Sequence, residues 1–187
     1  FETNWIAPVG PHIDSFDNKL SEISNNYHVA ALNSGTAAIH LALLVLGVTI
    51  LILLGNDIVY SKAFSDSFVQ DSFTKYIKIL IIIGSIFVLL SSQNFIKENN
   101  LNKFEYPIII LLAILGMFFI VSSNDLILFY LGLELQSLSL YILAAIDRDN
   151  IRSTESGIKY FVLSALSSGL LLYGCSLLYG FTGSTNF

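Results

Sequence analysis

Residues 126–146, LILFYLGLELQSLSLYILAAI, form an almost uninterrupted apolar stretch with one carboxylate, Glu134, near its middle. About twenty such residues span the hydrocarbon core of a bilayer as a single α-helix. A carboxylate at that depth costs roughly 2.5–3.5 kcal/mol on insertion scales, so it usually faces a partner or a hydrated cavity. The stretch therefore predicts a membrane helix that carries an acid serving ions or protons.

The composition of the whole chain agrees with a membrane protein. Of its 187 residues, 54% are hydrophobic and only 12% are charged, and the mean hydropathy is +0.70. A soluble domain carries about 25% charged residues. The net charge of −5 offers no surface for nucleic acid. The one cysteine, Cys175, and three scattered histidines give no metal-ligand spacing, so no metal site is expected.

Apolar segments are confined to the part of the chain after residue 38, whereas the residues before it are polar. There are five of them, at residues 39–54, 77–90, 106–121, 126–146 and 158–181. They predict an all-α, polytopic membrane bundle of about five transmembrane helices. Lys97 and Arg148 lie in alternate loops, and the positive-inside rule places these two loops in the cytoplasm.

The fourth segment also carries a polar stripe. Tyr130, Glu134, Ser137 and Tyr141 follow one another at steps of four, three and four residues, so they share one face of a helix. A polar stripe on an apolar helix faces another helix or a hydrated channel. In the first interpretation Glu134 is part of an ion path. In the second it is a structural residue, hydrogen-bonded to a neighbouring backbone.

Lys159 lies in the last segment and is a candidate partner of opposite sign for Glu134. If Asp149 caps the helix, Lys159 lies about nine residues into it, roughly 13 Å along the axis. The residues alone leave two readings open, a relay partner of Glu134 or a lysine that snorkels to the membrane surface. The small residues that follow, among them Ser164 and Ser168, predict close helix packing.

Three runs in the later part of the chain carry a resemblance to a known family: SSNDL, GLELQSLSLYILAA and SGIKYFVLSALSSGLLLYGCSLLYGFTGSTNF. They resemble subunit N, an antiporter-like membrane subunit of bacterial NADH:quinone oxidoreductase (respiratory complex I). The resemblance covers residues 49–187. It implies that Glu134 in the GLELQSL helix and Lys159 in the KYFVL helix belong to a proton-translocating channel, with Tyr130, Ser137 and Tyr141 on the channel face.

The same resemblance sets expectations for cofactors, partners and location. Later helices with further channel lysines are absent, so a C-terminally truncated subunit with an incomplete proton path is expected. No redox motif is present, so the chain is expected to bind no cofactor itself, while NADH, FMN, iron–sulfur clusters and quinone belong to the whole complex. The expected partners are other membrane-arm subunits and lipid, with no nucleic acid, in the bacterial inner membrane.

The polar start of the chain carries a different resemblance. Residues 28–32, HVAAL, predict a strand, residues 33–36 a turn, and Ala37 the start of a helix. The segment NWIAPVGPHIDSFDNKLSEISNNYHVAALNSGTAAIHLALLVLGV resembles the beginning of the DegT-type, pyridoxal-phosphate-dependent nucleotide-sugar aminotransferases. This implies a phosphate-holding turn at Gly35, Thr36 and Ala37. The Schiff-base lysine of that family would come far downstream, so the site is expected to be vestigial and no transaminase activity is expected.

The two resemblances divide the chain into two regions, an α/β aminotransferase-like fragment at 1–48 and a transmembrane region at 49–187. They meet within residues 44–50, inside an apolar run, which indicates a chimeric sequence. The leading interpretation is a proton-translocating membrane subunit with a Glu/Lys relay and no redox centre of its own. The alternatives are an inactive aminotransferase fragment and a structural helical membrane protein.

Overall fold

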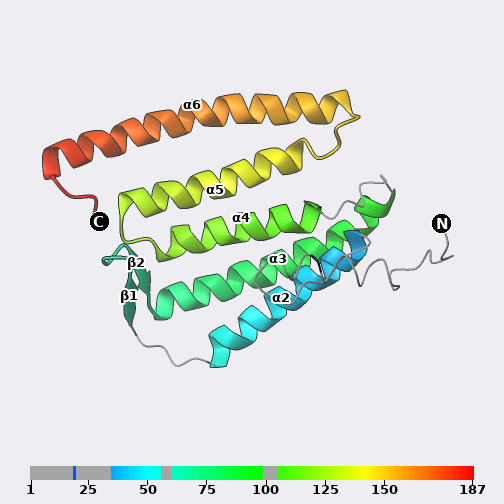
Figure 1. Cartoon of the computed structure of the whole chain (residues 1–187), viewed down its shortest axis with the longest axis horizontal. Helices are drawn as coiled ribbons and strands as arrows, with labels where there is room; N and C mark the ends of the chain where they lie inside the picture. The colour runs from blue at the N-terminus through cyan, green and yellow to red at the C-terminus, as the bar shows by residue number, and fades with distance from the viewer. Residues whose placement is uncertain (1–18, 20–34, 56–59, 99–104) are drawn as a thin grey trace.

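The computed structural model describes residues 19, 35–55, 60–98 and 105–187. Within these residues it contains five long helices and one short hairpin (Figure 1). In chain order the elements are α2 (Gly35–Gly55), β1 (Ser61–Ala63), β2 (Phe68–Gln70), α3 (Ser72–Glu98), α4 (Glu105–Ser122), α5 (Leu126–Ala144) and α6 (Ile151–Thr182). Four of the five predicted apolar segments lie within these helices, and the fourth, 126–146, extends two residues beyond the end of α5. The predicted helical bundle is confirmed.

The outer surface of the bundle is apolar. All five helices are long and apolar enough to cross a bilayer. Large side chains such as Leu44, Phe87 and Leu131 are more than half exposed on them. A surface of this kind is stable in lipid and not in water, because it leaves extensive apolar area uncovered. The chain is therefore a multi-pass membrane protein.

The helices lie side by side in chain order from α3 to α6, and α2 runs obliquely beside α3 (Figure 1). An apolar core joins α2, α3 and α4, and consists of Ala42, Leu46, Ile82, Leu89, Ile110 and Ile114. Helix α6 packs mainly against α5. Its only buried residue is Gly157, so most of this 32-residue helix is exposed.

Local hydrogen bonds explain where α5 and α6 begin. Asp125 caps α5, since its carboxylate accepts a hydrogen bond of 2.6 Å from the backbone N–H of Ile127. Asn150 caps α6 in the same way by accepting from Arg152 N–H at 3.0 Å. The prediction of Asp149 as this cap was therefore wrong by one residue.

One end of the bundle is tied together by backbone contacts. β1 and β2 pair antiparallel, and Phe68 of β2 also bridges to Ser123 between α4 and α5. Asn124 N–H donates to Ser67 C=O at 2.8 Å, and Leu126 N–H donates to Thr185 C=O at 2.8 Å. The loop after α2, the turn after α4 and the residues after α6 thus share one side, as expected for alternating membrane crossings.

The amino-terminal predictions have a mixed outcome. The strand predicted at 28–32 lies outside the described residues. The turn predicted at 33–36 is wrong in its second half, because α2 already begins at Gly35. Ala42 and Leu46 of the same helix are buried in the core against α3 and α4. The predicted boundary at residues 48/49 lies inside α2 and stays a prediction.

Candidate functional site

The polar stripe of α5 is the centre of the candidate site. Glu134 is the ninth of the 19 residues of α5, and it is half-buried. Tyr130 lies one turn before it, and Ser137 and Tyr141 follow. The Ser137 hydroxyl donates to the Leu133 carbonyl of its own helix, which satisfies its donor without a second helix. A carboxylate thus lies at mid-span on a helix face that also carries three hydroxyl groups.

Contacts between α5 and α6 fix how the two helices are aligned. A Cβ atom added at Gly157 would lie 2.6 Å from Ala145 Cβ, so these two residues are opposite each other. One to two turns further into the membrane, the Tyr141 hydroxyl donates to Ser164 Oγ. Because the helices are antiparallel, Glu134 is level with about residues 168–171 of α6, by the rise of about 1.5 Å per residue.

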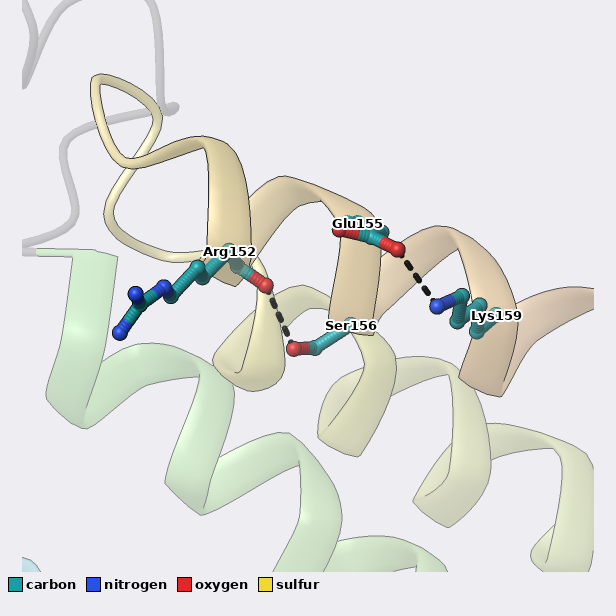
Figure 2. Close-up of polar contacts among 4 residues, drawn as sticks. All are labelled: Arg152, Glu155, Ser156 and Lys159. Carbon is teal, nitrogen blue, oxygen red and sulfur yellow. Dashed lines mark hydrogen bonds and ion pairs between the residues drawn. The ribbon is translucent and has the colours of Figure 1, made fainter.

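This alignment separates the two residues of the predicted relay. Lys159 is about 14–18 Å from the level of Glu134 along the axis of α6. Its Nζ instead lies 2.5 Å from Oε1 of Glu155, one turn earlier in the same helix (Figure 2). The Lys159 side chain is 70% exposed. The structure therefore does not bring Glu134 and Lys159 into contact, and any relay between them needs intermediate groups.

Tyr141 is the residue of the stripe that is held most firmly. It is only 7% exposed. In addition to its bond with Ser164, its ring makes edge-to-face contacts with Tyr160, at 4.8 Å between ring centroids, and with Phe161, at 5.8 Å. Such pairs stabilise a ring beyond the area that they bury. Tyr141 thus makes a polar contact between α5 and α6, in addition to the bond of 2.8 Å that the Ser153 hydroxyl donates to the Ala144 carbonyl.

Two cavities lie along the seam between α5 and α6. The first, of about 600 Å³, is lined by Tyr141, Gly157 and Phe161 and reaches the polar residues Glu105, Arg148 and Thr154. The second, of about 530 Å³, is lined by Tyr130, Leu172, Cys175, Ser176, Tyr179 and Thr185. Glu134 lies between Tyr130 and Tyr141 on α5. The stripe is therefore approached by a cavity at each end.

Lys78 is a buried charged residue that the sequence reasoning did not single out. It lies in α3, is only 6% exposed, and donates a hydrogen bond of 2.5 Å to Oε1 of Gln70. Its Nζ also lies 4.9 Å from the ring centroid of Phe68 and 5.9 Å from that of Phe118. The signal was present in the sequence, because Lys78 interrupts the second apolar segment. Its partners, however, come from two other elements, β2 and α4, which the sequence pattern does not place beside it.

Replacing Lys78 with methionine should weaken the attachment of the β1–β2 hairpin to the bundle. Methionine keeps an unbranched chain between the two rings, but it leaves the Gln70 carbonyl without its donor and removes the cation–π contacts. We expect a loss of roughly 1–3 kcal/mol in the free energy of unfolding. Thermal unfolding in detergent measures it. Lys62→Met, at an exposed position of the hairpin, is the control, and equal effects of both changes would contradict this role.

The predicted phosphate-holding residues lie in the first turn of α2. Gly35, Thr36 and Ala37 are followed at once by Ala38 and Ile39, which are buried. The first turn thus leads into a membrane-spanning helix, and the phosphate-holding role of these residues stays a prediction. Among the residues that the structure describes, no three His, Cys, Asp or Glu side chains cluster as metal ligands would.

Comparison with protein families gives two matches. Residues 123–187 match the transmembrane family NADH:quinone oxidoreductase/Mrp antiporter. This range contains Glu134, Lys159 and the residues of α5 and α6 that line the two cavities. Residues 1–63 match the DegT/DnrJ/EryC1/StrS aminotransferase family. Both resemblances found in the sequence are thereby confirmed.

Two proteins with similar sequences are named subunit N of NADH-quinone oxidoreductase. NADH-quinone oxidoreductase subunit N of Pelagibacter ubique is 60% identical over 124 residues, which is 66% of this chain and 26% of that protein. Subunit N of Parvibaculum lavamentivorans is 56% identical over 128 residues, which is 68% of this chain and 26% of that protein. The chain therefore spans about a quarter of the length of these relatives.

The fold has a solved counterpart. Respiratory complex I from Thermus thermophilus contains a chain that matches with a TM-score of 0.66 and 25% identity, covering 93% of this chain and 37% of that one. Since 93% of this chain is covered, this similarity extends into the residues 1–63 that also match the aminotransferases, and the two similarities overlap. In sequence this chain is similar to subunit N of bacterial NADH-quinone oxidoreductases, and in fold it is similar to a chain of a bacterial respiratory complex I.

Proposed function

We propose that this chain is part of a proton-translocating membrane subunit of a bacterial NADH-quinone oxidoreductase. The observation that carries the proposal is the 60% identity to a subunit N over 124 residues. The family match at residues 123–187 also contains the mid-span carboxylate of α5, Glu134. The other subunits of the membrane arm and the lipids of the inner membrane are its partners in this proposal. The positive-inside rule places the end of α3 that carries Lys97 and the loop that carries Arg148 in the cytoplasm.

In this function Glu134 binds a proton in the membrane and releases it. Tyr130, Ser137 and Tyr141 offer hydroxyl groups along the same helix face, and cavities reach Tyr130 and Tyr141 from opposite ends. Lys159 influences Glu134 through such intermediate groups, because about 14–18 Å of helix axis separates their levels. The chain binds no redox cofactor in this proposal. NADH, FMN, iron–sulfur clusters and quinone are bound by other subunits, which supply the driving reaction.

Co-purification tests the proposal directly. An affinity tag on this chain, expressed in its own membranes, is expected to recover a large complex that oxidises NADH and reduces a quinone analogue. A purely structural helical protein, or an aminotransferase fragment, would be recovered without that activity. Recovery of the chain free of NADH dehydrogenase activity, together with unchanged membrane NADH oxidation after deletion of its gene, would show that the proposal is wrong.

A further inference from the structure

We infer that the hydrogen-bonded hydroxyls of Tyr141 and Ser164 form the proton-carrying contact across the α5–α6 seam, linking the cavity at the Arg148 end to Glu134. This rests on the proposed proton-translocating function and names two residues through which it passes. The sequence pattern treated Ser164 as a packing residue only. Its bond to a tyrosine of the polar stripe gives it a different role.

The position of the pair along the membrane supports this assignment. Ser164 is five residues beyond Lys159 on α6, about 7–8 Å along the axis. Tyr141 is seven residues beyond Glu134 on α5, about 10–11 Å along the axis. The hydroxyl pair therefore lies between the levels of the two charged residues. The distance between Glu134 and Lys159 is too long for either side chain to bridge, and the hydroxyl pair divides it into two shorter distances.

A cavity reaches the pair from one side, and a further hydroxyl lies on the other side. On one side the cavity of about 600 Å³ ends at Tyr141 and reaches Arg148 and Glu105. On the other side Ser168 lies one turn beyond Ser164 on the same face of α6, half-buried and level with Glu134 and Ser137. A cavity of this size holds several water molecules, which need polar partners such as these hydroxyls.

The geometry also keeps the hydroxyl of Tyr141 in place. The edge contacts with Tyr160 and Phe161 fix the orientation of its ring, and burial at 7% exposure keeps bulk water from competing for its hydroxyl. The bond to Ser164 crosses between helices, whereas the Ser137 hydroxyl bonds within its own helix. Among these hydroxyls of the stripe, that of Tyr141 alone is shown to pass a hydrogen bond to α6.

The transfer step conserves atoms and charge. A protonated water in the cavity gives a proton to the Tyr141 oxygen as the tyrosine O–H proton moves to Ser164 Oγ. The proton of Ser164 then passes to a water on the Ser168 side, which delivers it to the Glu134 carboxylate. Each oxygen forms one O–H bond and breaks one, and both side chains end neutral. Rotation of the two hydroxyls restores the starting arrangement.

Tyr141→Phe and Ser164→Ala test this inference in the assembled complex. Each removes one hydroxyl and keeps the bulk of its side chain, and inside-out vesicles report both NADH oxidation and proton uptake. We expect protons moved per NADH to fall about fivefold in each variant, with assembly unchanged. The double variant should be no worse than the single ones, because both remove the same contact.

Two further variants separate a proton path from packing. Ser164→Thr restores a hydroxyl and should recover most of the pumping ratio. Tyr173→Phe removes a tyrosine hydroxyl from an exposed position of α6 and should change nothing. An unchanged ratio in both Tyr141→Phe and Ser164→Ala would overturn the inference. So would a parallel loss of assembly and pumping in Ser164→Ala that Ser164→Thr does not correct.

The result that would contradict this inference differs from the result that would contradict the proposed function. If Glu134→Gln stops pumping while Tyr141→Phe and Ser164→Ala do not, the function stands and the proton reaches Glu134 by another route. If the complex pumps normally with Glu134→Gln as well, the carboxylate role itself is wrong.

Discussion

Replacing Glu134 with glutamine is expected to abolish proton translocation by the complex that contains this chain, with a loss of roughly a hundredfold or more in the rate of proton transfer. Glutamine has nearly the same shape and volume as glutamate, but it cannot bind and release a proton near neutral pH. The half-buried position at the middle of α5 would accept it without repacking. The change therefore removes proton binding and leaves the helix packing in place.

The measurement compares proton uptake with NADH oxidation in the same inside-out vesicles. Glu134→Asp should retain part of the pumping, because it keeps a carboxylate one methylene shorter. Glu98→Gln is the matched control, since it removes a carboxylate from the exposed end of α3, outside the polar stripe. Normal pumping in Glu134→Gln would favour the structural interpretation, in which this side chain only holds helices together.

The helical architecture could be predicted from sequence because the signal is local. Each crossing shows as an apolar run, and a helix in lipid satisfies its backbone hydrogen bonds within itself. The stripe from Tyr130 to Tyr141 is equally local, because a helical period alone places those residues on one face. These features need no knowledge of neighbouring helices, and the structure contains them.

The alignment between helices could not be predicted in the same way. Whether Glu134 meets Lys159 depends on the packing of Gly157 against Ala145 and on the six residues that join α5 to α6. Neither is visible in a periodic pattern. The burial of Lys78 is a similar case, because Gln70 and Phe118 approach it from outside its own helix. The opposite charges and the family resemblance predict a pair of Lys159 with Glu134, whereas the structure pairs Lys159 with Glu155.

Glycine determines how closely α4 and α5 approach, and this contact supports the helix that carries Glu134. A Cβ atom at Gly132 would lie 2.9 Å from both the Cγ1 and the backbone nitrogen of Ile120. A Cβ atom at Gly116 would lie 2.7 Å from the backbone nitrogen of Gln136. Backbone atoms cannot move aside as the end of a side chain can. Each glycine is therefore required by the approach of the facing helix.

Gly132→Ala should consequently destabilise the chain by about 1–3 kcal/mol and move α5 away from α4. Gly84→Ala in α3 is the control, because a Cβ atom there meets nothing within 4 Å and alanine favours the helix. Thermal unfolding in detergent compares the two variants. Because Glu134 is only two residues from Gly132, the displaced helix should also lower proton translocation in vesicles where the complex still assembles. Equal stability of both variants would show that α4 and α5 separate without cost, and the close glycine contact would then not be what positions the carboxylate.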